Sequence, residues 1–271
     1  MRGKRVNIVP RKSIRNVMRL IDAAKEVLPP EQSFLNDLKR SIEITADKDS
    51  RLPSKTYKPS GMNCIRQSYY QLMGVQPDES ASSFIGVGIC NSGTDIHVRV
   101  QTAVAEMKDN GMDCEYIDVA DFIKARGLDY LNVVAKSGME TKLYHTKLNM
   151  SFMCDGIIRY KNHYYILELK TENSYKFINR KDVDESHYNQ ATAYALSLGL
   201  DSVIFVYISR DTLDMKSFMF NVTGEMKEGL VGYIEECDGY VKRMIAPPKS
   251  DYVSKKTCNY CGYKNQCKKD G

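Results

Sequence analysis

The sequence predicts an α/β fold in which a mixed central sheet is flanked by helices, in the order helix, three strands, helix, strand. Three observations carry this prediction. From residue 140 apolar residues alternate with a period of two, residues 185–198 return to helical spacing, and residues 203–208 form an unbroken apolar run. With 42% hydrophobic and 27% charged residues among 271, the chain is typical of a globular protein that buries a core. No apolar run approaches the roughly 18 residues that a membrane span needs.

The N-terminal third is expected to be mainly helical. Residues 13–45 have apolar residues at helical spacing, interrupted by Pro29-Pro30, and residues 47–60 are polar enough for a linker. A tyrosine-rich helix is expected after Gly61, and another from about residue 93 to 108. We therefore expect a helical, basic extension at 1–60 and one domain at 61–271.

The remaining elements are expected to build the sheet and its cover. Residues 143–149, 151–160 and 164–171 are predicted to form three antiparallel strands, with Lys161-Asn162-His163 as the turn between the last two. A helix over 185–198 ends at Gly199. The apolar run 203–208 predicts a strand covered on both faces. An edge strand at 213–222 and a last helix over about 225–245 complete the prediction.

Positive charge is concentrated near the N-terminus. A net charge of +5 is too small to indicate a nucleic-acid partner by itself. Residues 1–21 nevertheless carry no acid, and their basic residues are Arg2, Lys4, Arg5, Arg11, Lys12, Arg15 and Arg19. Such an arm can contact phosphates or can be a solvated end, and both interpretations stay open.

The central region holds three candidates for catalysis, Asp155, Glu168 and Lys170. Glu168 and Lys170 stand two residues apart on an expected strand, so they share one face, and strand pairing can bring Asp155 beside Glu168. Two neighbouring carboxylates repel each other and favour a divalent cation such as Mg²⁺ or Mn²⁺. Lys170 can then orient or deprotonate an attacking water. An exposed charged face is the alternative interpretation.

Four more polar residues accompany this trio. His97 follows Gly93 by one helical turn, and its imidazole can add a metal ligand. Glu140 precedes the first expected strand and can support the metal site from its side. Gln190 and Tyr194 are four residues apart on one helix face, from which they can contact a phosphate or a base. A structural role, or a surface position for Glu140, is the alternative for each.

Cysteines near the C-terminus have the spacing of a metal site. Eight cysteines in a chain without an export signal argue against a disulfide framework. Cys258, Cys261 and Cys267 follow a C-x2-C-x5-C pattern in a short polar tail that has little apolar material to pack. Cys64 is the candidate for the fourth thiolate. Four thiolates suit zinc or an iron–sulfur cluster, so the spacing leaves the metal open.

The order of these motifs resembles the RecB-type branch of the PD-(D/E)XK nuclease superfamily. The positions that carry the resemblance are Gly93 with His97, Asp155, Glu168-Leu169-Lys170, and Gln190 with Tyr194. Cys64-Ile65-Arg66 and the three C-terminal cysteines make the chain similar to the Fe–S members, which include CRISPR-associated exonucleases, their viral relatives and the AddB nuclease domain. The resemblance covers about residues 60–267. Cys154 stands where the superfamily has proline, and residues 151–155 lack the usual glycine.

The resemblance implies a restriction-endonuclease-like core with a helical periphery clamped by a [4Fe–4S] cluster on Cys64, Cys258, Cys261 and Cys267. It implies Mg²⁺ or Mn²⁺ bound by His97, Asp155, Glu168 and the carbonyl of Leu169. Lys170 becomes the catalytic lysine, Gln190 and Tyr194 contact DNA, and Glu140 and Arg66 take supporting positions. The implied activity is a metal-dependent deoxyribonuclease, an exonuclease acting on DNA ends or single strands.

Two other functions stay open. A structure-specific or sequence-specific endonuclease can use the same fold. A zinc-stabilised nucleic-acid-binding protein with a degenerate core is the second, although the intact Asp155, Glu168 and Lys170 argue against it. No helicase P-loop is present, so unwinding would need a helicase or another recombination or CRISPR-type partner. We expect no membrane association, a cytoplasmic location in a bacterium, an archaeon or a virus-infected cell, and leave an oligomer open.

Overall fold

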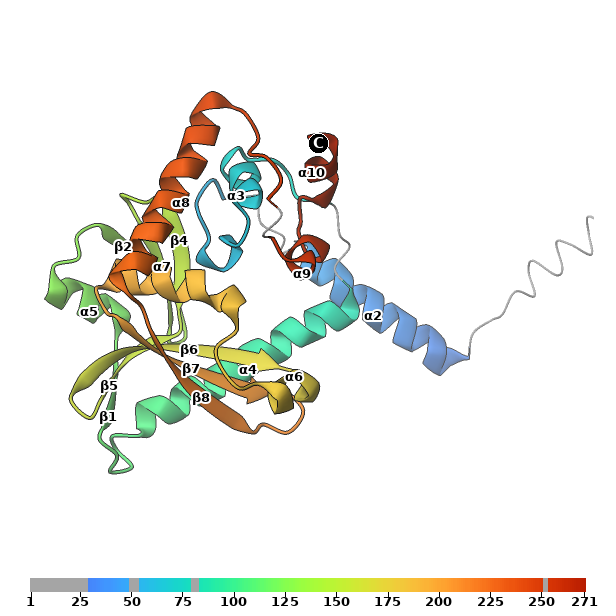
Figure 1. The fold of residues 1–271 in the computed structure, drawn as a ribbon. Coiled ribbons are helices and arrows are strands. Elements are labelled where there is room, and N and C mark those ends of the chain that lie inside the picture. Colours follow the sequence, from blue (N-terminus) through green and yellow to red (C-terminus); the bar gives the residue numbers. More distant parts are fainter. Residues whose placement is uncertain (1–28, 49–53, 79–82, 251–252) are drawn as a thin grey trace, which may run out of the picture.

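A computed structural model describes residues 29–48, 54–78, 83–250 and 253–271 (Figure 1). The basic N-terminal arm and residues 13–28 of the first expected helix lie outside the described residues. None of the described helices is both long and apolar enough to cross a bilayer.

The main sheet is mixed, as the sequence predicts. Its strands follow the order β1-β5-β6-β7-β8, with β6 and β7 parallel and the other pairs antiparallel. The strands are β1 (Cys114–Ile117), β5 (Gly156–Tyr160), β6 (His163–Glu172), β7 (Ser202–Ser209) and β8 (Met215–Asn221). The predicted turn is confirmed: Lys161 and Asn162 adopt positive φ and join β5 to β6, because a two-residue hairpin favours left-handed backbone at both positions.

Helices cover both faces of this sheet, which confirms the expected flanking arrangement. On one face lies α4 (Phe84–Glu106), and on the other lies α7 (Tyr188–Leu198); α8 (Gly224–Arg243) packs against α7, and α3 (Ile65–Leu72) packs against α8 (Figure 1). Strand β7 separates two hydrophobic clusters: Val203 and Phe205 belong to one, and Ile208 belongs to the other. The unbroken apolar run is therefore a strand covered on both faces. β8 lies at the edge of the sheet, also as predicted.

The expected set of three antiparallel strands in one sheet is wrong. Residues 151–160 are two strands, β4 (Met150–Cys154) and β5, which belong to different sheets. β4 pairs with β3 (Glu140–His145) and β3 pairs with β2 (Leu131–Ser137) in a separate antiparallel sheet. The chain changes sheets at Asp155. Gly156 is required just after this point, since a Cβ there would lie 2.6 Å from the ring of Tyr116.

Several element boundaries depend on capping residues that the apolar spacing does not show. α4 begins at Phe84 rather than near residue 93, after Ser83, whose side chain accepts a hydrogen bond from the amide of Gly86. α5 (Val119–Arg126), absent from the sequence prediction, starts after Asp118 and ends at Gly127, which has φ 62°. α6 (Ser174–Asn179) was also not expected and follows β6 directly.

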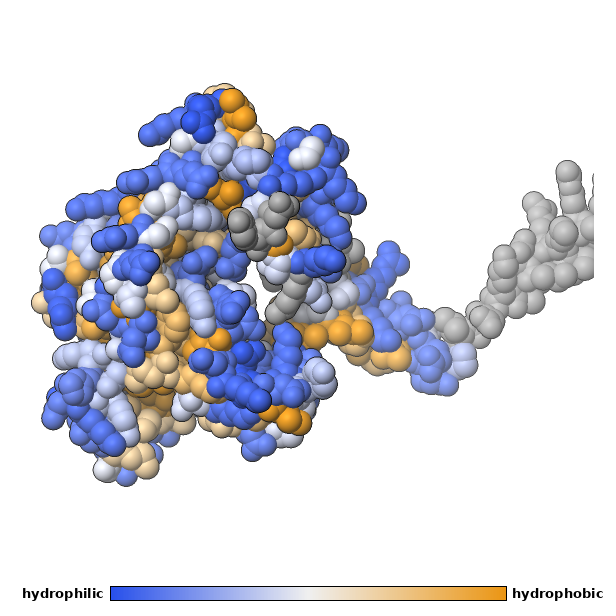
Figure 2. All heavy atoms as spheres, viewed as in Figure 1, coloured by the Kyte–Doolittle hydropathy of each residue, from blue (hydrophilic) through white to orange (hydrophobic). Residues whose placement is uncertain are grey.

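The remaining described segments border this core. They are α2 (Pro30–Lys48), the short 3-10 helices η1 (Pro59–Gly61) and η2 (Glu185–His187), and the tail helices α9 (Lys255–Asn259) and α10 (Lys264–Lys269). Hydrophobic side chains gather on the surface where α2 packs against α4, among them Phe34, Leu38 and Ile89 (Figure 2). Tyr57, inside the expected linker, is buried and donates a hydrogen bond to Asp238 at 2.7 Å. The boundary at residue 60 stays a prediction.

Candidate metal-binding active site

Asp155 lies where the chain passes from one sheet to the other, and two hydrogen bonds hold it there. The amide N–H of Leu169 donates to its Oδ2 at 2.7 Å. The side-chain amide of Gln101 donates to its backbone carbonyl, also at 2.7 Å. Asp155 is 7% exposed, so its carboxylate is both buried and oriented. Gln101 was missed by the sequence prediction, although it lies four residues after His97 on the same face of α4.

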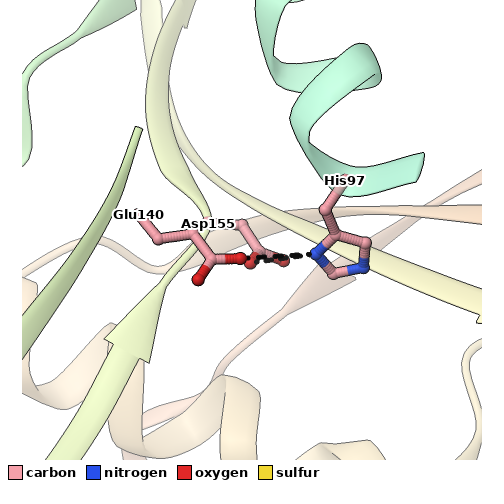
Figure 3. A group of neighbouring side chains, drawn as sticks. All are labelled: His97, Glu140 and Asp155. Atoms are coloured by element: carbon pink, nitrogen blue, oxygen red, sulfur yellow. Dashed lines mark ion pairs between the residues drawn. The ribbon is translucent and has the colours of Figure 1, made fainter. Parts of the chain in front are cut away.

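His97, Glu140 and Asp155 converge on one point (Figure 3). His97 comes from the middle of α4, Glu140 is the first residue of β3, and Asp155 follows β4. The Nδ1 atom of His97 lies 3.5 Å from Asp155 Oδ1 and 3.7 Å from Glu140 Oε1. One ligand atom from each residue lies within 4.8 Å of the others. Two carboxylates and an imidazole in this arrangement can hold a divalent cation.

The glycine one turn before His97 has a structural reason. A Cβ on Gly93 would lie 3.1 Å from Oγ1 of Thr171 on β6, tighter than ordinary van der Waals contact. A glycine therefore lets α4 approach β6 closely at this turn. His97 follows one turn later on α4, where its Nδ1 atom lies 3.5 Å from Asp155 Oδ1.

A second group of side chains joins β6 to α7. Lys170 Nζ lies 2.7 Å from Glu168 Oε1 and donates to Gln190 Oε1 at 2.8 Å. The amide nitrogen of Gln190 donates to Glu168 Oε1 at 2.7 Å and to the Tyr194 hydroxyl at 2.8 Å. The hydroxyl of Tyr194 in turn donates to the carbonyl of Met153. Both faces predicted from spacing, Glu168 with Lys170 and Gln190 with Tyr194, are thereby formed.

Tyr194 supports this network from within the core and is not accessible to a ligand. It is 3% exposed, and its ring stacks on Phe152 with the ring centroids 5.0 Å apart. A buried ring with an engaged hydroxyl cannot stack on a nucleobase, so the expected direct contact of Tyr194 with DNA is not what this geometry provides. Its hydroxyl instead fixes the amide of Gln190, which orients Glu168 and Lys170.

The surroundings of Glu168 disfavour the charged form of its carboxyl group. Burial raises the pKa of its carboxyl, and the charge of Asp155 adds to this, while the ammonium of Lys170 acts in the opposite direction. Its Oε2 atom is buried and has no hydrogen-bond partner among the described residues. An unsatisfied buried carboxylate oxygen is costly. It is also an available acceptor in a carboxylate that interacts electrostatically with Asp155 and His97.

The structure brings the predicted metal ligands together only in part. Glu140, expected to support the site from its side, is one of the three converging ligands, and Glu168 is not in that group. Leu169 contributes its amide N–H to Asp155, and its carbonyl as a metal ligand stays a prediction. Glu140 is positioned by the β2–β3 hairpin, and that hairpin was not part of the sequence prediction.

The four expected cysteines lie around one cavity of about 250 Å³, although Cys64 is far in sequence from the other three. Cys64 precedes α3, and the other three belong to the tail, on and between α9 and α10. Burial raises the pKa of the Cys261 thiol, and the neighbouring thiols of Cys64, Cys267 and Cys258 raise it further. Of the other cysteines, Cys114, Cys154 and Cys237 are buried, and Cys90 is exposed on α4.

Arg66 lies beside this cavity and not at the carboxylate site. Its guanidinium donates to the carbonyl of Gly271 at 2.9 Å and to that of Asp270 at 3.0 Å. The hydroxyl of Tyr70 donates to the carboxylate of Asp270 at 2.7 Å. The supporting role expected for Arg66 therefore concerns the attachment of the tail to α3.

Loss of the proton from His97 should make the metal-free protein less stable at alkaline pH. Burial opposes protonation, but the contacts with Asp155 and Glu140 outweigh it and raise the pKa to about 9. The stabilisation is complete below the unfolded pKa of about 6.5 and is lost as pH rises through about 9; it amounts to at most about 3 kcal/mol. With EDTA present, we expect Tm to fall between pH 6.5 and pH 9.5, and Mn²⁺ to restore it at the higher pH.

The variant His97→Asn serves as the control, since it lacks the titrating group. Its Tm should change less over the same pH interval, and Mn²⁺ should restore less of it. Equal pH dependence of Tm in the two proteins would show that His97 is not held protonated between the carboxylates.

Comparison with known proteins gives limited similarity. No family model matches the sequence, and no curated protein matches it. Among solved structures, SSO0001 is 15% identical with a TM-score of 0.46, covering 86% of this chain and 96% of its own. The alkaline exonuclease LHK-Exo from Laribacter hongkongensis is 13% identical with a TM-score of 0.40, covering 71% and 92%. LHK-Exo in complex with dAMP is 12% identical with a TM-score of 0.39, covering 70% and 91%. These similarities are too low to assign a family or a function.

Proposed function

We propose that this protein is a metal-dependent deoxyribonuclease, an exonuclease that hydrolyses phosphodiester bonds at DNA ends or in single strands. The observation that carries the proposal is the convergence of His97, Glu140 and Asp155 on one point. The Glu168–Lys170 pair, held at 2.7 Å, stands in the same site. Buried charged groups are costly, and this concentration of them next to a candidate cation site supports catalysis over a structural role.

The donor set fits Mg²⁺ or Mn²⁺. Carboxylate oxygens suit these cations, and a neutral imidazole suits Mn²⁺. The buried Oε2 atom of Glu168, which has no partner among the described residues, offers a further oxygen. We propose His97, Glu140, Asp155 and Glu168 as the ligands, with the Leu169 carbonyl. A bound cation supplies a Lewis acid that stabilises negative charge on a phosphoryl oxygen.

Lys170 is the group proposed to act on the attacking water and the phosphate. Its Nζ atom is held by two acceptors, Glu168 Oε1 and Gln190 Oε1. The side chain keeps 22% of its surface exposed, whereas that of Glu168 keeps 4%. A fixed ammonium at the solvent edge of the site can hydrogen-bond an incoming water or phosphate oxygen. Gln190 and Tyr194 are proposed to hold it in place.

We further propose that the four cysteines hold a [4Fe–4S] cluster. Four thiolates suit either zinc or an iron–sulfur cluster, and all four cysteines line one cavity. The resemblance of the sequence to Fe–S members of the RecB-type branch favours the cluster. Such a cluster would join α3 to the tail.

A cleavage assay on DNA of different topology tests the proposed activity. Protein purified without oxygen should digest linear single strands or linear duplexes in Mg²⁺ or Mn²⁺ and leave closed circles intact, because an exonuclease needs an end. EDTA should stop the digestion. Digestion of single strands alone would indicate that a helicase partner supplies unwound DNA.

Two outcomes of this assay would indicate a different function. Equal cutting of linear and closed circular DNA would indicate a structure-specific or sequence-specific endonuclease on the same fold. Tight DNA binding without any cleavage, by a protein that contains zinc, would indicate a nucleic-acid-binding protein with a degenerate core.

A further inference from the structure

α6 is a short helix that the surrounding residues hold rigidly. It has six residues, Ser174–Asn179. At its start the side chain of Asn173 accepts from the amide of Lys176, and the amide of Ser174 donates to Asp211 at 2.8 Å. At its end Lys216 Nζ donates to the carbonyls of Phe177, Ile178 and Arg180, at 2.7, 3.1 and 3.1 Å. One side chain, Phe177, is buried beneath it.

The outer face of this helix is hydrophobic and exposed. Tyr175 is 80% exposed and Ile178 is 72% exposed, and their spacing of three residues places them side by side. A pocket of about 330 Å³ opens next to Tyr175. Its other lining residues are Lys176, Asn179, Arg180, Lys181, Asp182 and Asp184.

Two of the three cations at this pocket are available to an anionic ligand. Arg180 is engaged, because it binds both carboxylate oxygens of Glu172 at 2.9 Å and Asp184 at 3.2 Å. Of the acids, Asp184 is compensated by Arg180, and Asp182 accepts a hydrogen bond from the amide of Val183. Lys176 and Lys181 form no ion pair with any residue that the structure describes.

The helix belongs to a segment that begins and ends at the candidate active site. Residues 171–189 start directly after Lys170 and stop directly before Gln190, and Lys170 Nζ lies 2.8 Å from Gln190 Oε1. Figure 1 shows α6 beyond the C-terminal end of β6. Five residues of fully extended chain span at most about 18 Å. The Cα atom of Tyr175 therefore lies no farther than this from the Cα atom of Lys170, a separation that a few nucleotides of single strand can bridge.

We propose that Tyr175 is a stacking platform for an unpaired nucleobase of the substrate strand, with Ile178 beside it and Lys176 and Lys181 contacting the neighbouring phosphates. An exposed aromatic ring combined with unpaired lysines is how proteins bind single-stranded nucleic acid. The face of a base inside a duplex is covered by the neighbouring bases stacked on it, so the platform selects an unstacked base in a single-stranded or frayed segment next to the cleaved bond. This inference rests on the nuclease function proposed above.

Binding measurements on the full chain test the platform. Dissociation constants for a fluorescein-labelled 20-nucleotide single strand are measured with EDTA present, so that no cleavage occurs. Tyr175→Ala should weaken binding by about 5- to 100-fold, the range expected for one lost stacking contact, and Tyr175→Phe should retain it. Phe34→Ala is the matched control, because Phe34 is 68% exposed on α2, and it should bind like the parent. The double variant Lys176→Gln/Lys181→Gln should lower the salt dependence of binding by about 1.4 in log–log slope.

An abasic residue placed at successive positions of the strand makes the test specific. The parent protein should lose affinity when the missing base is the one that stacks, and Tyr175→Ala should be insensitive to the same abasic position. If the parent digests DNA and Tyr175→Ala shows the parent affinity and abasic profile, the platform is wrong and the nuclease stands. If the parent shows the abasic profile and digests no DNA, the platform stands and the nuclease function falls.

Discussion

Changing Glu168→Gln should abolish DNA cleavage and at the same time raise the Tm of the metal-free protein. The buried carboxylate has an oxygen without a partner among the described residues, and burial raises its pKa. A neutral amide of the same shape ends the repulsion between the buried carboxylates of Glu168 and Asp155, and its oxygen can still accept from Lys170, whose side chain is 22% exposed to water. Cleavage should fall on the order of 10³-fold or more, because the carboxylate is proposed to hold the cation. Single-turnover cleavage rates in Mg²⁺ or Mn²⁺ measure the first effect, and thermal scans with EDTA measure the second.

Lys170→Ala should lose cleavage to a similar extent while DNA binding is largely retained. Affinity comes mainly from many lysine and arginine contacts with phosphates, whereas Lys170 is proposed to act at the reacting phosphate. Lys124→Ala, at an exposed lysine on α5, is the control and should cleave like the parent. Full activity of Lys170→Ala, or a Glu168→Gln protein that still cleaves, would remove this site assignment.

Cys261→Ala should remove a brown chromophore that absorbs near about 400 nm, and should lower the Tm of the whole protein. Metal binding by thiolates contributes about 10–16 kcal/mol in small structural zinc sites, and the tail helices α9 and α10 have little core of their own. Loss of the cluster would leave the cavity of about 250 Å³ between α3 and the tail unfilled, and the contacts across it would be lost. Iron and sulfide analysis, absorption spectra and thermal scans under anaerobic conditions provide the measurements.

Cys90→Ala is the matched control for this prediction, because Cys90 is exposed on α4 and lies outside the cavity. It should keep the colour, the iron content and the Tm of the parent. A colourless parent protein with one zinc and no iron, even when made anaerobically, would show that the cysteines bind zinc. A Cys261→Ala protein that melts like the parent would show that the cluster does not clamp the tail.

Local periodicity was sufficient for part of the site. Glu168 and Lys170 share one face of β6 because side chains alternate along a strand, and Gln190 and Tyr194 share one face of α7 because four residues make about one helical turn. The same reasoning located β7 and β8. It did not locate α5 or α6, which depend on capping residues in short segments.

The change of sheets at Asp155 was missed by the sequence prediction, although Asp155-Gly156 is a dipeptide typical of turns. Apolar residues on both sides of this dipeptide favoured one long strand over residues 151–160. The break follows from the packing of two sheets against each other and from the close contact of Gly156 with Tyr116. Because of this break, Asp155 points its carboxylate at His97 and Glu140 and does not lie in a regular strand ladder.

The sequence by itself determined which residue types could form a metal site and a cysteine site, and which pairs share a face, because these depend on spacing over a few residues. Only the tertiary structure decided that Glu140 joins His97 and Asp155, that Tyr194 is buried under the site, and that Arg66 binds the tail. These outcomes depend on how α4, the β2–β3 hairpin and the C-terminal helices pack against the sheet. Packing between elements distant in sequence is set by the fit of whole surfaces, which no local pattern encodes.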